Sequence, residues 1–191
     1  MPNNDIWNSA NLVKTLKDGG VAVMPTDTLY GIVGRAENIS AVERIYKIRK
    51  RSPEKPCIIL IGNIRELEKF SIFLLREQKE ILKQYWFSNS KPVSVVLDCS
   101  NEKFSYLHRG TKTLAFRLPA EAGLQNLLKQ TGPLVAPSAN PEGLPPAQTI
   151  AEARTYFGDL VDLHIDGGGI KGEASKVIKL HKDGTVTVLR F

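Results

Sequence analysis

Two clusters of polar residues that directly follow short apolar runs could bind a small ligand. The first, PTDTLYG at residues 25–31, comes after the run at residues 21–24 and offers three hydroxyl groups and one carboxylate. The second, APSAN at residues 136–140, follows another apolar run and offers the Ser138 hydroxyl and the Asn140 amide. Hydroxyls, amides and carboxylates together can hold a polar ligand by hydrogen bonds. Ordinary turns rich in Thr, Asp, Asn and Pro are the alternative explanation for both clusters.

A third cluster, DGGGIKGEAS at residues 166–175, resembles a phosphate-binding loop because of its glycines. A Walker A loop requires Lys and then Ser or Thr directly after its last glycine. Here Gly172 is followed by Glu173 and Ala174, so we exclude a Walker site.

Other catalytic templates are absent from the sequence. His108, His164 and His181 are isolated and do not have the spacing of a zinc site. There is no GxSxG motif, and neither Cys57 nor Cys99 lies in a known nucleophile motif. The remaining chemistry is positioning and charge neutralisation by Arg, Lys, hydroxyl and amide groups, which is typical of phosphoryl or nucleotidyl transfer.

Positive charge is concentrated between residues 43 and 55. This segment has two acidic residues and six basic ones: Arg44, Lys47, Arg49, Lys50, Arg51 and Lys55. Clustered bases attract anions such as nucleotide phosphates or an RNA backbone. The alternative is a helix face that is simply solvated.

Hydrophobic periodicity predicts the elements that position these clusters. We expect helices over residues 8–17, 40–49, 64–70, 75–85, 120–129 and 149–157, the second with Ser40 and Glu43 as a capping box. We expect strands over residues 21–24, 57–61, 93–97, 113–117, 134–136 and 161–165, and a hairpin of residues 176–180 and 185–190. Alternating helices and strands predict an α/β fold, and the hairpin makes its sheet mixed. Ligands of open α/β sheets bind beyond strand ends, where the polar clusters occur.

Composition sets the remaining limits. The 191 residues carry a net charge of +6 and predict a single domain over residues 1–191. No apolar run approaches the ~20 residues of a membrane-spanning helix, and the sequence MPNNDIWNSA does not resemble a secretory signal. Cys57 and Cys99 lie in apolar runs, which favours buried free thiols in a reducing, cytoplasmic protein.

Taken together, the motifs resemble those of the YrdC family, the threonylcarbamoyl-AMP synthases, in its single-domain form. The matching segments, in order along the chain, are PTDTLYG at residue 25, RKRSPEKP at 49, FRLP at 116, GPLVAPSANPEG at 132 and IDGGGIKGEASKVIKL at 165. They span nearly the whole chain. The resemblance implies a twisted mixed sheet with flanking helices and a basic concave cavity.

The resemblance also implies an activity. Such enzymes are nucleotidyltransferases that condense L-threonine, bicarbonate and ATP to threonylcarbamoyl-AMP and pyrophosphate. Partner transferase proteins then pass the threonylcarbamoyl group to tRNA. Mg²⁺ is expected with ATP, without protein side chains as its ligands. No membrane partner is expected.

Site residues follow from matching positions in the family motifs. The resemblance places Thr28, Arg117, Ser138 and Ser175 around threonine. It places Arg51, Lys55, Thr113, Asn140, Gln148 and Arg190 around ATP. The catalytic set is Arg49, Arg51 and Lys55. Arg117 is expected to bind the amino-acid carboxylate through a bidentate fork, while Arg51 and Lys55 neutralise phosphate charge.

The chain departs from the family pattern at three places. Arg49 replaces the usual lysine and Ser52 the usual proline of the basic motif, the loop at residues 86–92 lacks the usual glycine, and Lys176 replaces a threonine. A catalytically silent relative that binds double-stranded RNA or tRNA in the same basic concavity is therefore the alternative hypothesis.

Overall fold

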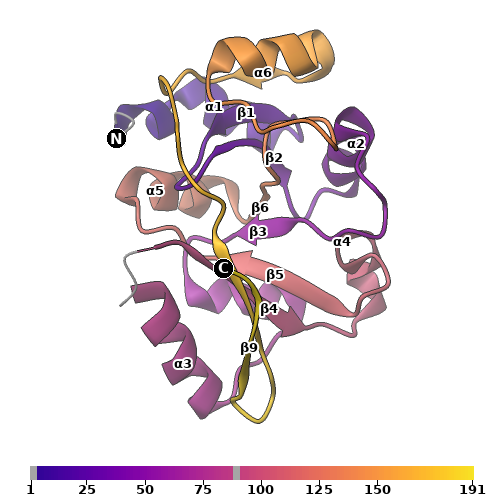
Figure 1. Cartoon of the computed structure of the whole chain (residues 1–191), viewed down its shortest axis with the longest axis vertical. Coiled ribbons are helices and arrows are strands. Elements are labelled where there is room, and N and C mark those ends of the chain that lie inside the picture. The colour runs from indigo at the N-terminus through magenta and orange to yellow at the C-terminus, as the bar shows by residue number, and fades with distance from the viewer. Residues whose placement is uncertain (1–3, 88–90) are drawn as a thin grey trace.

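The computed structural model describes residues 4–87 and 91–191, and its strands form one mixed sheet (Figure 1). The strand order is β7-β1-β2-β6-β3-β5-β4-β8-β9. The strands are β1 (Ala22–Pro25), β2 (Tyr30–Arg35), β3 (Ile58–Leu60), β4 (Val93–Asp98), β5 (Thr113–Arg117), β6 (Leu134–Val135), β7 (Leu163–His164), β8 (Lys176–Leu180) and β9 (Val186–Arg190). Parallel pairs join β1 to β7, β3 to β5 and β4 to β8, and the other neighbours are antiparallel. The predicted α/β fold with a mixed sheet and flanking helices is confirmed.

Helices flank this sheet. The α-helices are α1 (Ala10–Lys17), α2 (Ile39–Arg49), α3 (Arg76–Phe87), α4 (Ser105–His108), α5 (Ala122–Thr131) and α6 (Ile150–Phe157). The 3₁₀ segments are η1 (Asn4–Asn8), η2 (Ile64–Phe70), η3 (Glu102–Phe104) and η4 (Gly158–Leu160). Helices α1 and α6 lie beside β1 at one end of the molecule, and α3 lies near the other end with the β8–β9 hairpin (Figure 1). No helix in the described ranges is long and apolar enough to cross a bilayer.

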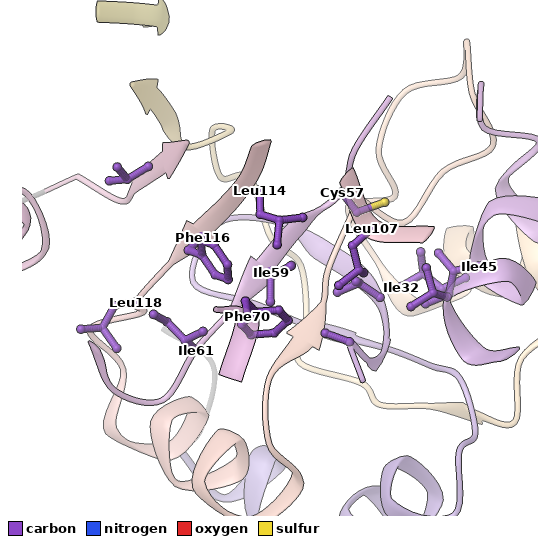
Figure 2. Close-up of a cluster of buried hydrophobic side chains, with 14 of the residues drawn as sticks. Ile32, Ile45, Cys57, Ile59, Ile61, Phe70, Leu107, Leu114, Phe116 and Leu118 are labelled. Atoms are coloured by element: carbon purple, nitrogen blue, oxygen red, sulfur yellow. The ribbon is translucent and has the colours of Figure 1, made fainter. Parts of the chain in front are cut away.

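Alternating side chains build a core on each face of the sheet, because neighbouring residues of a strand point to opposite faces. Leu114 and Phe116 of β5 pack with Ile59 and Phe70 in the larger core (Figure 2). Leu60, the neighbour of Ile59, belongs instead to the second core, with residues of α1 and α5. The alternate residues of β5, Thr113, Ala115 and Arg117, point to the other face of the sheet, where they can face a ligand.

Register then determines which side chains share the ligand-facing side. Ala115 pairs with Val96 of β4, and Arg117 pairs with Ser94 of the same strand. Directly paired residues point to the same face of a sheet. A row of polar and small side chains therefore crosses the sheet beside the second core.

Several predicted boundaries are wrong. Asn38, rather than Ser40, caps α2, because its side chain accepts a hydrogen bond from the Ala41 backbone N–H. The expected helix at 64–70 is a 3₁₀ segment, and the expected strand at 161–165 is reduced to the two residues of β7. Strand β2 and helix α4 are not predicted by the sequence pattern. The glycine-free loop at 86–92 falls partly on residues 88–90, and MPNNDIWNSA partly on residues 1–3, both outside the described residues.

Candidate functional site

A cavity of about 570 Å³ opens on the ligand-facing side of the sheet. Its walls come from the β1–β2 turn, the loop before β3, strands β4, β5 and β9, the loop after β6 and the segment leading into β8. Segments from all parts of the chain thus meet here. The volume suits a small-molecule ligand.

The β1–β2 turn is held by its own hydroxyl groups. Thr26 donates from its backbone N–H and from Oγ1 to the Leu29 carbonyl, at 3.0 and 2.7 Å. The Thr26 and Thr28 hydroxyl oxygens lie 3.1 Å apart and both residues line the cavity. The polar PTDT turn therefore presents ordered hydroxyls to a ligand.

A buried ion pair anchors this turn to β5. The Arg117 guanidinium donates from Nε and Nη2 to the Asp27 carboxylate at 2.7–3.1 Å, and Nη2 also donates to Thr28 Oγ1 at 3.2 Å. The two side chains are only 4% and 2% exposed. The Nε–Nη2 edge of Arg117 is thus occupied by Asp27, and its Nη1 group makes no hydrogen bond to a described residue.

The loop after β6 rests on a buried arginine. Arg49 is 3% exposed and donates from Nε to the Asn140 carbonyl at 2.9 Å and from Nη2 to Asn140 Oδ1 at 3.3 Å. Nη2 also lies 3.4 Å from Ser138 Oγ, whereas Nη1 is buried and has no hydrogen-bond partner among the described residues. Burial, followed by repulsion from Arg51, lowers the pKa of Arg49 to about 10. Arg49 therefore supports the Ser138–Asn140 loop from behind.

The glycine-rich segment closes over the β1–β2 turn. The Tyr30 hydroxyl donates to the Gly168 carbonyl at 2.8 Å and accepts from the Gly167 N–H at 2.8 Å. A Cβ at Gly172 would overlap the Thr28 carbonyl oxygen. This contact explains why glycine is needed at residue 172: the backbone approaches the turn too closely for a side chain.

The basic loop carries two different kinds of cation. Arg51 lines the cavity, and its guanidinium donates to the Lys55 and Pro56 carbonyls, each at 3.0 Å. Lys55 instead forms an ion pair with Glu142, which also accepts hydrogen bonds from the backbone and side chain of Ser52. Arg51 belongs to none of the ion pairs among the described residues, so its charge is available to an anion.

Ser175 and Arg190 form a further part of the cavity wall. Arg190 donates from Nη2 and Nε to the Ser175 carbonyl at 2.8 and 3.1 Å, and Nη2 lies 3.5 Å from Ser175 Oγ. Burial, followed by the positive charge of Arg117, lowers the pKa of Arg190. The guanidinium groups of Arg117 and Arg190 thus face the same cavity as that of Arg51, an arrangement suited to an anionic ligand.

Metal-ion ligands are not part of this arrangement. The described part of the chain contains no group of three or more His, Cys, Asp or Glu residues that could hold a metal ion. The one carboxylate of the PTDT turn, Asp27, already pairs with Arg117. The cavity residues therefore do not fit a protein-bound Mg²⁺.

Comparisons with known proteins identify the family. A family model for Sua5, YciO and YrdC proteins, described as "Telomere recombination", matches residues 14–191. The chain belongs to this family. The resemblance inferred from the motifs is therefore confirmed.

Three similar proteins illustrate the match. A threonylcarbamoyl-AMP synthase of Halorhodospira halophila is 31% identical over 82% of this chain and 82% of its own length. The crystal structure of Pyrococcus abyssi Sua5 complexed with L-threonine is 27% identical, with a TM-score of 0.83 over 97% of this chain. This chain spans about half, 54%, of that protein. Escherichia coli YciO is 26% identical, with a TM-score of 0.81 over 100% of this chain and 90% of its own.

The fold brings most of the residues predicted from the family motifs to one cavity. Seven line it: Thr28, Arg51, Thr113, Arg117, Ser138, Ser175 and Arg190. Four lie outside its lining, namely Arg49, Lys55, Asn140 and Gln148. Arg49 and Asn140 support the loop that carries Ser138, and their roles in the reaction stay predictions.

Sequence reasoning missed three residues that hold the site together. Asp27 and Tyr30 lie inside the PTDTLYG motif, but the motif does not indicate which residues their polar groups contact. Ser94 lies in the apolar run that forms β4, and a lone polar residue on the inner face of a predicted strand was the available signal. Each owes its role to a partner distant in the sequence.

The Glu142 ion pair predicts a pH dependence of stability. Hydrogen bonds from Lys55 and from the Ser52 backbone lower the pKa of Glu142 to about 2. Because the pKa of Glu142 is depressed in the folded state, the ionised carboxylate stabilises the fold. Its contribution to stability is complete above the unfolded pKa near 4.5 and is lost as the pH falls toward 2. Between about pH 6 and about pH 3, wild type should therefore lose more stability than Glu142→Gln in urea unfolding. Equal losses in the two proteins would contradict the prediction.

Proposed function

We propose that this protein synthesises threonylcarbamoyl-AMP from L-threonine, bicarbonate and ATP, with release of pyrophosphate. The observation that supports it most directly is the joint presence, in one cavity, of hydroxyl groups from three loops and the guanidinium groups of Arg51, Arg117 and Arg190. Hydroxyls suit the polar amino acid, and guanidinium groups suit carboxylate and phosphate. The relative from Halorhodospira halophila carries the name of this activity.

Threonine would lie between the β1–β2 turn and the Ser138 and Ser175 loops. Since Asp27 occupies the Nε–Nη2 edge of Arg117, a ligand carboxylate would meet the free Nη1 group instead of the expected bidentate fork. The Thr26 and Thr28 hydroxyls would then be within the same enclosure as the amino-acid side chain.

The reaction would proceed in two bond-forming steps. The threonine amine attacks the carbon of bicarbonate and water leaves, which gives a carbamate. A carbamate oxygen then attacks the α-phosphorus of ATP and pyrophosphate leaves. Arg51 would neutralise charge that develops on the leaving pyrophosphate, and positioning in the cavity would lower the entropic cost. This chemistry is that of a nucleotidyltransferase.

Several wider roles belong to the same proposal. The product would serve tRNA modification in the cytoplasm, with transferase proteins as partners. Mg²⁺ would be held by ATP phosphate oxygens and water, because the cavity residues do not fit it. The alternative of a silent RNA-binding relative has less support, because relatives across this chain's length are named as synthases.

The proposal is tested by pyrophosphate release. We expect release from ATP only when threonine and bicarbonate are both present. Replacing threonine with valine should lower kcat/KM by at least about tenfold, because a site that binds the hydroxyl leaves its polar groups unpaired when valine enters. Equal turnover of valine would contradict a hydroxyl-reading site. Absence of release with all three substrates would contradict the proposed function.

A further inference from the structure

One row of paired residues crosses the sheet beneath the cavity. Arg117 of β5 pairs with Ser94 of β4, which pairs with Val177 of β8, which pairs with Arg190 of β9. Directly paired residues share a face, so all four side chains point to the cavity side. Ser94 therefore lies between the two arginines that face the ligand space.

Ser94 does not reach the cavity itself. It is 0% exposed and is absent from the cavity lining, whereas Ser175 is part of that lining. The two hydroxyl oxygens lie 2.8 Å apart, and this is the only side-chain hydrogen bond of Ser94 within the described residues. Whatever Ser94 does for a ligand, it does through Ser175.

Burial determines which hydroxyl donates. If Ser175 donated to Ser94, the Ser94 hydrogen would be buried without an acceptor, and leaving a buried donor unpaired is costly. Ser94 is therefore the donor and Ser175 Oγ the acceptor. Arg190 Nη2, 3.5 Å away, also faces Ser175 Oγ as a donor. The hydrogen of Ser175 is then left to point into the cavity.

The geometry points to Ser94 as a positioning residue that makes the Ser175 hydroxyl a hydrogen-bond donor to the ligand. The ligand group at this position is accordingly an acceptor oxygen, such as a carboxylate or hydroxyl oxygen of the amino acid. This inference rests on the proposed function, because it assigns the threonine subsite a donor of fixed direction.

A double-mutant cycle tests the inference. L-threonine binding is measured by calorimetry for wild type, Ser94→Ala, Ser175→Ala and the double variant. We expect Ser94→Ala to weaken threonine binding about three- to tenfold, the size of one lost hydrogen bond. The double variant should bind no more weakly than Ser175→Ala, because Ser94 acts only through Ser175.

Kinetics and conservative variants separate positioning from folding. In pyrophosphate release, Ser94→Ala should raise KM for threonine and leave kcat within about twofold. Ser94→Thr keeps the hydroxyl and should restore binding. Thr131→Ala is a matched control: it removes another buried hydroxyl, which donates to Leu127 at 3.0 Å and lies outside the cavity lining, and it should leave threonine binding unchanged.

Four results would overturn the inference. Additive losses in the double variant would show that Ser94 does not act through Ser175. Wild-type threonine affinity in Ser94→Ala, or an equal loss in Thr131→Ala, would show that the hydroxyl has no specific role. Wild-type protein that binds no threonine would overturn the proposed function, and this inference with it.

Discussion

Replacing Arg51 with alanine is expected to lower kcat/KM for ATP by about 30- to 1000-fold, or ~2–4 kcal/mol of transition-state stabilisation. Arg51 lines the cavity, and its hydrogen-bond partners are two neutral carbonyls. Its full charge can therefore stabilise phosphate oxygens as pyrophosphate leaves. Steady-state pyrophosphate release at varied ATP measures the effect.

Lys47→Ala is the matched control for this prediction. Lys47 lies on the exposed side of α2, within the same basic segment but outside the cavity lining. Removing it changes the net charge of the protein equally, and we expect little change in kcat/KM. An equal loss in both variants would assign the effect to the general field of the basic segment. Wild-type kinetics in a folded Arg51→Ala protein would contradict the prediction and show that Arg51 is only a solvated charge.

Replacing Asp27 with alanine is expected to lower the free energy of unfolding by about 3–5 kcal/mol. The reason is that Arg117 would keep its charge in a buried position without its carboxylate partner. Replacing both residues, as Asp27→Ala with Arg117→Met, should recover much of this loss, because no unpaired buried charge remains. Urea unfolding of the three proteins and wild type measures the difference.

The exposed pair Lys83–Glu80 supplies the comparison. Both side chains are more than half exposed, at 56% and 60%, although their atoms are 2.9 Å apart. Solvent screens such pairs, so Glu80→Ala should cost no more than about 1 kcal/mol. If Asp27→Ala cost as little, the buried pair would not be what anchors the β1–β2 turn.

The sequence by itself determined the family, the alternation of helices and strands, and the segments that form the site. Hydrophobic periodicity and turn chemistry are local properties of the sequence, so they can be recognised without knowledge of the fold. For the same reason β5 and β8 were predicted with their exact bounds. Strand β2 was missed because its first residues, Tyr30 and Gly31, belong to the polar motif that follows β1.

Only the tertiary structure decided how charged residues of one local motif divide their tasks. The basic segment looked uniform, yet Arg49 is buried, Arg51 faces the cavity and Lys55 pairs with Glu142. Helix α2 ends at Arg49, and the chain then turns toward β3, so consecutive residues point in different directions. The number of charges in a segment does not predict these orientations, because the direction of each side chain depends on where the helix packs.

Contacts between residues far apart in the sequence could likewise not be predicted from the sequence. Asp27 and Arg117 are 90 positions apart, and Ser94 and Ser175 are 81 positions apart. Their contacts depend on strand order and register, and a shift of β4 or β5 by one residue would turn Ser94 or Arg117 to the opposite face. The sequence therefore determined which chemical groups are present, and the register of β4, β5, β8 and β9 decided which of them act together.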